Sequence, residues 1–153
     1  MAKKLDLKSF VISKLRSASR KWPPLYEQLK KATVYVDVDI DAGIITVQET
    51  GEELLLKDFK EFRVKKSGRR KMIRCAKCKK LSFDKFWSKT LKGKWRKMSA
   101  TALDHIDPVV PTSGWKSFDD FIDRLFNGKT QVLCHKCHSE KTKGENSERR
   151  RHK

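Results

Sequence analysis

Apolar residues in the first thirty positions recur every three or four residues between lysines and arginines. The apolar positions are Leu7, Phe10, Val11, Leu15 and Ala18. This spacing predicts an amphipathic helix over residues 5–21. Pro23 and Pro24 end it, and a second short helix is expected over residues 25–31. The two basic helices either cover the core or lie along a phosphate backbone.

A two-residue period replaces the helical one at residue 33. The segment TVYVDVDIDAGIITVQE, residues 33–49, alternates β-branched and polar side chains around the turn signal at residues 41–43, which predicts a β-hairpin. Apolar side chains in residues 54–64 fit either a strand or a short helix. The basic run KKSGRRKMIR, residues 65–74, surrounds a glycine and is expected to form a loop, either a linker or a contact for phosphates.

The C-terminal third shows a helix, a strand and a polar end. Ser117 followed by Asp120 is an N-cap signal, and Gly128 marks the end of the helix. The apolar face of this helix consists of Phe118, Phe121, Ile122, Leu125 and Phe126. The segment TQVLC, residues 130–134, predicts a short strand, and the segment after it has helical potential. The polar, basic end of the chain has no apolar period and is expected to fray without DNA.

Charge narrows the class of partner. The 153 residues contain 37 lysines and arginines against 19 acids, a formal charge of +18, with a sequence pI near 10.0. Such an excess favours a polyanion, because each cation that neutralises a phosphate releases counterions. An acidic membrane surface is a weaker alternative to nucleic acid, and no apolar run approaches the roughly 20 residues that cross a bilayer. DNA, and no membrane, is the expected partner. The N-terminus lacks a secretory signal pattern, and a cytoplasmic location is expected.

The four cysteines form two CxxC pairs. Cys75 and Cys78 lie in RCAKC, and Cys134 and Cys137 lie in LCHKC. In a reducing cytosol this spacing favours a tetrahedral zinc ion bound by four thiolates over disulfides or unrelated free thiols. A site with four sulfur ligands is saturated, so its role is structural. The gap of residues 79–133 is longer than in a compact zinc ribbon, so the zinc would join the ends of a larger unit.

Two histidines and an aspartate suggest a second site. Asp104 and His105 stand before Pro108, where a strand is expected to end and where functional groups often lie. His138 directly follows the second cysteine pair, in the first turn of the expected helix, and would point away from the zinc toward Asp104. His135 has no partner in this arrangement and is expected on the surface. The alternative is that these histidines are structural, but their grouping favours a functional site.

These pieces together resemble the HNH endonucleases, in particular the small zinc-containing group common in bacteriophages. The similar segments are RCAKC, LDHIDPVV, GWKSFDDFIDRLF, QVLCHKCHSEKT and Glu145. The resemblance covers about residues 1–32 and 72–146. Residues 33–64 match no part of the family and are expected to be an insertion. It implies an α+β fold: a ββα-metal finger with a structural zinc site of four cysteines, N-terminal helices and an inserted β-hairpin region.

The resemblance also implies roles for individual residues. Asp104 and His138 would hold a catalytic Mg²⁺ or Mn²⁺, and His105 would be the general base that activates water. The family's middle asparagine usually stands where this chain has Lys129. Either Asn127 fills that role from a shifted loop or the chain lacks it. The products would be 5′-phosphate and 3′-hydroxyl ends.

The expected organisation has four parts: a basic helical extension (1–32), a β-rich insertion with a basic linker (33–71), the nuclease domain (72–146) and a basic tail (147–153). The expected DNA contacts are Arg69, Arg70, Lys71, Arg74, Lys129, Lys141, Arg149 and Arg150.

The leading hypothesis is a phage-encoded HNH DNA endonuclease, a hydrolase of the host cytoplasm that acts as a monomer or weak dimer. Genome packaging beside terminase or portal proteins, homing and host-DNA degradation would all use the same site. The alternatives are a noncatalytic zinc-containing DNA-binding protein and a junction-resolving nuclease.

Overall fold

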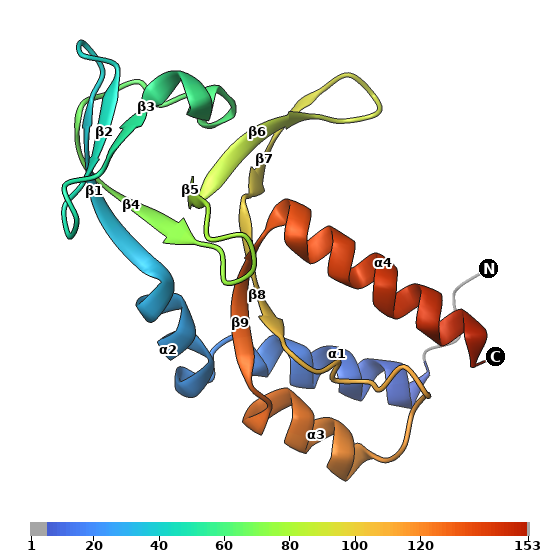
Figure 1. Cartoon of the computed structure of the whole chain (residues 1–153). Helices are drawn as coiled ribbons and strands as arrows, with labels where there is room; N and C mark the ends of the chain where they lie inside the picture. The colour runs from blue at the N-terminus through green and yellow to red at the C-terminus, as the bar shows by residue number, and fades with distance from the viewer. Residues whose placement is uncertain (1–5, 153) are drawn as a thin grey trace.

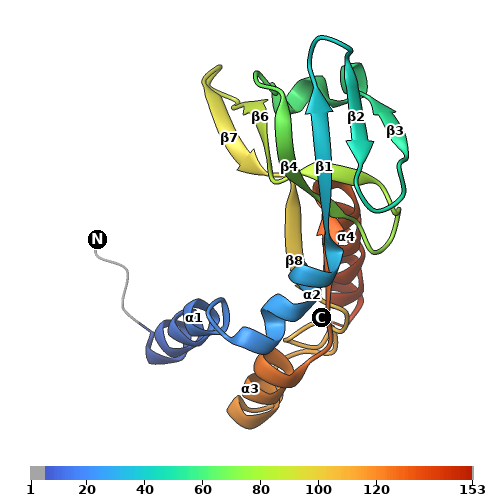
Figure 2. The same cartoon turned by 90° about the vertical axis from the view of Figure 1, so that its left-hand side faces the viewer.

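The computed structural model describes residues 6–152. It is a mixed α+β structure of helices and antiparallel sheets. A five-stranded sheet lies at one end of the molecule and two helices, α1 (Leu7–Ser19) and α3 (Phe118–Asn127), lie at the other (Figure 2). Residue 5, where the first helix was predicted to begin, and residue 153, at the end of the predicted tail, lie outside the described residues.

Two N-terminal helices form where they were predicted. Asp6 caps α1 by accepting hydrogen bonds from the backbone N–H groups of Lys8 and Ser9. The two prolines occupy the first positions of α2 (Pro23–Ala32), where their missing N–H groups cost nothing. The α1 helix packs against α3 with only part of its apolar face, since Leu7 is 74% exposed.

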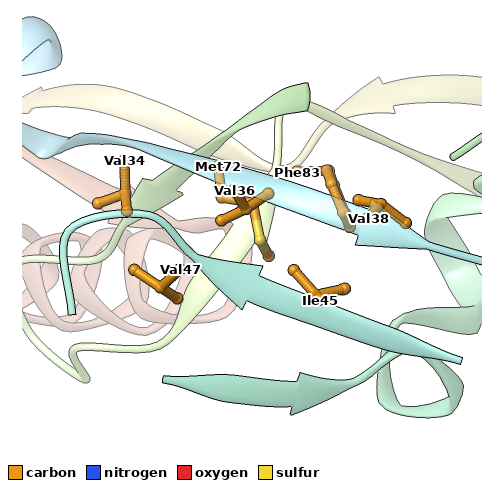
Figure 3. Packing of buried hydrophobic residues seen from close by; sticks show 7 residues of the cluster. All are labelled: Val34, Val36, Val38, Ile45, Val47, Met72 and Phe83. Carbon is orange, nitrogen blue, oxygen red and sulfur yellow. The ribbon is translucent and has the colours of Figure 1, made fainter. Parts of the chain in front are cut away.

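The large sheet holds the main hydrophobic core. Its strands are β1 (Thr33–Asp39), β2 (Ile44–Val47), β3 (Glu53–Leu55), β4 (Gly68–Arg74) and β5 (Leu81–Phe83), in the antiparallel order β3-β2-β1-β4-β5. The predicted hairpin is confirmed as β1 and β2, which pair Val36 with Val47 across a turn where Gly43 has φ +69°. Figure 3 shows the core side chains on one face of this sheet: Val34, Val36, Val38, Ile45, Val47, Met72 and Phe83.

The basic run at residues 65–74 is not the loop that was predicted. Its last seven residues form β4, which pairs with β1 on one side and β5 on the other. Met72 and Ile73 are buried in this strand, while Arg69 and Lys71 are exposed. The boundary expected between residues 71 and 72 therefore falls inside a strand. The ambiguous segment 54–64 contains both alternatives, because β3 is followed by the 3-10 helix η1 (Leu56–Phe62).

Two further strand pairs connect the sheet to the C-terminal helices. The β6 (Lys85–Lys89) and β7 (Trp95–Ser99) hairpin was not predicted. Only Ala100 separates β7 from β8 (Thr101–His105), which pairs with β9 (Thr130–Cys134). The predicted cap of α3 is confirmed, because the Ser117 hydroxyl accepts a hydrogen bond from the Asp120 backbone N–H.

The last helix, α4 (His135–Arg151), follows β9 without a linker and packs against both β8 and β9 (Figure 1). The basic end that was expected to fray is helical through Arg151. Within residues 6–152, no helix has the length and apolar character needed to cross a membrane.

Candidate metal centre and adjoining polar cavity

All four cysteines meet at the junction of the sheet and the C-terminal unit. Cys75 and Cys78 follow β4, Cys134 ends β9, and Cys137 lies in the first turn of α4. Their sulfur atoms all lie within 4.8 Å of one another, and the Cys78 and Cys134 sulfurs are 3.8 Å apart. Zn–S bonds of about 2.3 Å in a tetrahedron place sulfurs about 3.8 Å apart. The cluster could therefore hold a structural metal such as zinc.

Backbone hydrogen bonds shape the first cysteine pair into a knuckle. The Lys79 N–H donates to the Cys75 carbonyl at 3.0 Å, and the Cys75 N–H donates to the Lys80 carbonyl at 3.0 Å. Lys79 adopts φ +62°, a left-handed conformation that closes this turn. The Ala76 N–H donates to the Val132 carbonyl at 2.8 Å, which fixes the knuckle to β9.

The electrostatics of the cluster favour a cation. Burial opposes ionisation of Cys75, but backbone hydrogen bonds from Cys134, Cys78 and Lys77 outweigh it and lower the pKa of this thiol to about 6. Burial, and then the neighbouring thiols, raise the pKa of Cys137 to about 12. Four thiols this close cannot all ionise without a positive charge between them, and a divalent metal supplies that charge.

His135 stays outside the cluster. Its side chain is exposed, as predicted, and its ring meets the edge of the Phe86 ring at 5.6 Å between centroids. Its backbone N–H donates to the Ala100 carbonyl at 2.8 Å, which ties the start of α4 to the junction of β7 and β8.

A polar cavity of about 310 Å³ lies at the other end of β8. It is formed by the end of β8, the segment that follows it, one face of α4, and Arg16 from α1. The residues lining it are Arg16, Leu103, Asp104, His105, Pro108, Val109, Val110, His138, Lys141, Thr142, Glu145 and Arg149. The cavity therefore contains Asp104, His105 and His138, as predicted.

The Asp104 carboxylate is shared between a histidine and a lysine. Its Oδ1 lies 3.8 Å from His138 Nε2, and its Oδ2 lies 3.0 Å from Lys141 Nζ. Lys141 also donates to the His105 carbonyl at 2.8 Å and to the Glu145 carboxylate. Burial opposes the charge of Lys141, but the hydrogen bonds to Glu145 and Asp104 prevail and raise its pKa. The lysine therefore remains charged and orients Asp104 so that Oδ1 faces His138.

His105 ends β8 and has one ring nitrogen fixed. Its Nε2 lies 2.9 Å from the Leu125 carbonyl, which can only accept a hydrogen bond. Nε2 must therefore carry the proton, and in the neutral ring Nδ1 is left free to accept one. Gly128 permits this packing, because a Cβ there would lie 3.1 Å from His105 Cδ2 and 2.3 Å from the Arg124 carbonyl oxygen.

Glu145 and Arg149 also line the cavity. Glu145 was expected only as part of the family resemblance, and Arg149 only as a DNA contact. Glu145 accepts from Lys141, and Arg149 lies 3.8 Å from Glu145 and donates to the Val110 carbonyl at 3.1 Å. The spacing of His138, Lys141, Glu145 and Arg149 along one helix carries the signal, because residues three, four or seven apart share a helix face. Arg16 has no comparable signal, since it reaches the cavity from the far end of the chain.

Several predicted residues lie elsewhere. Asn127 is exposed at the end of α3, where its side-chain amide donates to Asp123 at 2.8 Å, and it does not line the cavity. Lys141 lines the cavity, where its three N–H donors have protein acceptors, and the phosphate contact expected of it stays a prediction. Arg74 donates to the Lys79 carbonyl at 3.3 Å beside the knuckle. The remaining expected DNA contacts outside the cavity are Arg69, Arg70, Lys71, Lys129 and Arg150.

Comparison of the chain with protein-family models, curated proteins and solved structures gives no match. A functional proposal therefore rests on the geometry of the chain itself.

Proposed function

We propose that this protein is a metal-dependent DNA endonuclease of the HNH type. The observation that carries the proposal is the pair formed by Asp104 Oδ1 and His138 Nε2, 3.8 Å apart, beside His105 with one free ring nitrogen. Two antiparallel strands and a helix, β8, β9 and α4, form the unit that supplies all three side chains. The charge of +18 supports a polyanionic substrate.

The spacing of the pair fits a shared cation. Two ligand atoms of one octahedral ion, each about 2.1 Å from it, lie about 3.0 Å apart at adjacent positions and about 4.2 Å apart at opposite ones. The observed 3.8 Å lies between these values, so a small side-chain movement would bring the pair to a shared ion. Asp104 and His138 would hold Mg²⁺ or Mn²⁺, whose chemistry is to neutralise charge that develops on the scissile phosphate. One carboxylate and one imidazole leave other positions of such an ion open to water and phosphate.

His105 would act as the general base. With Nε2 donating to Leu125, the free Nδ1 would accept the proton of the attacking water. Attack of the water oxygen on phosphorus would form a new P–O bond and break the bond to the 3′ oxygen. That oxygen would leave with the electron pair and take a proton from solvent, giving a 5′-phosphate and a 3′-hydroxyl.

A noncatalytic DNA-binding protein remains the second candidate, and one observation favours it. The cationic groups of Lys141 and Arg149 already compensate the charges of Asp104 and Glu145. An ion-pair network of this kind is also what a purely structural site would contain.

A plasmid assay with histidine variants tests the proposal. The zinc-loaded protein, freed of loosely bound divalent cations, is incubated with supercoiled plasmid, with and without added Mg²⁺ or Mn²⁺. We expect cleavage only with the added cation, and a loss of about 10²–10⁴-fold in His105→Ala. His135→Ala is the matched control, because this exposed histidine lies outside the cavity. Nicks with 5′-phosphate and 3′-hydroxyl ends can be resealed by DNA ligase.

The outcomes separate the candidates. Equal cleavage by wild type and His105→Ala would remove the role given to this histidine. Binding of the plasmid without cleavage in any cation would favour the noncatalytic protein. Preferential cutting of a four-way junction over linear duplex would identify a junction-resolving nuclease.

A further inference from the structure

A basic groove of about 820 Å³ lies between the large sheet and the β6–β7 hairpin, away from the cavity around Asp104. Its walls come from the segment after η1, from β4 and from the hairpin. The cationic residues lining it are Arg63, Lys65, Lys66, Arg69, Arg70, Lys71, Lys85 and Lys97. Three of these eight, Arg63, Lys85 and Lys97, lie outside every segment that was expected to contact DNA. Phe62, Val64, Phe83, Trp87 and one acid, Asp84, complete the lining.

The positive charge of this groove is not compensated within the described part of the chain. None of its eight cations forms an ion pair with a carboxylate of residues 6–152. Two of the arginines lie against aromatic rings instead: Arg63 is 4.2 Å from the Trp95 ring and Arg69 is 4.4 Å from the Tyr35 ring. Arg70 donates to the Lys66 carbonyl, but its Nε is buried without a partner. Bringing together like charges this way is unfavourable unless a polyanion lies among them.

We infer that this groove binds the phosphate backbone of the DNA that flanks the cleavage site. Lysine and arginine side chains facing one another across an open groove suit a chain of regularly spaced phosphates. The inference rests on the proposed function for its choice of DNA, but the binding it describes requires no cleavage.

The connection between the groove and the cavity sets the length of DNA involved. Lys97 in the groove and Asp104 in the cavity are seven residues apart on β7 and β8. A fully extended chain of that length spans about 23 Å, which is an upper limit on the separation of their backbones. At about 3.4 Å per base pair, the groove would be reached within about seven base pairs of the scissile phosphate.

The test measures binding of a fluorescent duplex of about 30 base pairs, long enough to cover both the groove and the cavity. The protein is the zinc-loaded full chain carrying His105→Ala, so that cleavage does not interfere. One variant carries Lys65→Gln, Lys66→Gln, Lys85→Gln and Lys97→Gln. The control carries Lys57→Gln, Lys60→Gln, Lys92→Gln and Lys116→Gln, which remove the same charge from exposed positions outside the groove and the cavity. Both must retain zinc and the melting temperature of the parent protein.

We expect the groove variant to raise Kd at least about tenfold near 100 mM salt, and to make the slope of log K against log salt shallower by up to about 3.6. The control should change Kd less than about threefold. Equal losses in the two variants, or tighter binding of anionic vesicles than of DNA, would overturn the inference. If a single strand binds as well as the duplex, the groove still binds a phosphate backbone, but that of single-stranded DNA.

A separate measurement distinguishes this failure from that of the proposed function. These measurements use the background without His105→Ala. If the wild-type protein cleaves plasmid and the groove variant binds DNA as tightly as the control, the groove inference fails and the proposed function stands. Salt-sensitive binding in the groove without cleavage in any cation contradicts the nuclease alone.

Discussion

The two ends of the β8–β9 pair carry sites of opposite character. At one end, where Thr101 pairs with Cys134, four sulfurs surround one position. A metal ion bound there by all four would have no open coordination site. At the other end, where His105 pairs with Thr130, charged and imidazole groups line an open cavity. About 13 Å of strand separates them. The closed site suits a structural role and the open site suits chemistry, because only the open site leaves room for another molecule.

The largest expected effect comes from breaking the closed site. Cys78→Ser removes one sulfur from an exposed cysteine without opening a hole in the core. Structural zinc contributes about 10–16 kcal/mol in small zinc-binding units, so loss of the metal should unfold the region that joins the sheet to α4. Metal content by mass spectrometry and thermal unfolding followed by circular dichroism check this. His135→Ala should keep the metal, and a Cys78→Ser protein with unchanged metal and melting would refute the assignment.

Breaking the open site should remove the reaction and leave the fold. Asp104→Asn keeps the shape of the side chain but removes the charge that faces His138 and Lys141. We expect plasmid cleavage to fall at least about 100-fold, since a bound cation contributes several kcal/mol to transition-state stabilisation. Zinc content should not change. Loss of zinc in this variant would show that the two sites are not independent.

A smaller effect is expected from the lysine that orients the aspartate. Lys141→Met removes the hydrogen bonds that hold Asp104 Oδ2 and the His105 carbonyl. Groups that orient a metal ligand typically contribute about 10–100-fold to metal affinity or activity. The variant should therefore need more Mg²⁺ for half-maximal cleavage. Lys141→Arg should recover part of this loss, whereas an unchanged Mg²⁺ requirement would mean that Lys141 does not orient Asp104.

The same lysine makes stability depend on pH in the alkaline range. Because hydrogen bonds raise its pKa above the ordinary value of 10.5, its stabilising contribution is complete below about pH 10.5. That contribution is lost as pH rises through the higher pKa of the folded state. The difference in unfolding free energy between wild type and Lys141→Met should therefore shrink above pH 10.5. Chemical denaturation at several pH values measures it.

The smallest effect is expected at Asn127. Its amide bonds only to Asp123 on the exposed end of α3, so Asn127→Ala should change the unfolding free energy by less than about 0.5 kcal/mol. Cleavage should change less than about twofold. A loss of about 100-fold would instead favour the role that the family resemblance gives to this asparagine.

The sequence predicted what depends on short spacings. The CxxC pairs, the β1–β2 alternation and the Ser117 cap are all local patterns, and the structure confirms the elements they indicate. Asp104, His105 and His138 were also expected together, and the cavity contains all three. Their catalytic roles stay a prediction.

What the sequence did not predict depends on contacts between distant segments. The β4 strand has a glycine and a run of cations at its start, and it is a strand because β1 and β5 supply its hydrogen bonds on both sides. The hairpin of β6 and β7 carries lysines and tryptophans with no clear apolar face. Arg16 reaches the cavity only through the packing of α1, which no local pattern encodes.

Cys137 and His138 are consecutive residues of α4, so the cysteine cluster fixes the rotation of this helix about its own axis. Each residue of an α-helix turns the chain by about 100°. Because Cys137 is held in the cluster, the next residue, His138, can point in only one direction from the helix. Lys141 and Glu145 lie further along the same helix, so their positions are fixed in the same way. One residue inserted between Cys137 and His138 would preserve every side chain in both sites. It would nevertheless turn the face carrying His138 by about a quarter of a circle away from Asp104.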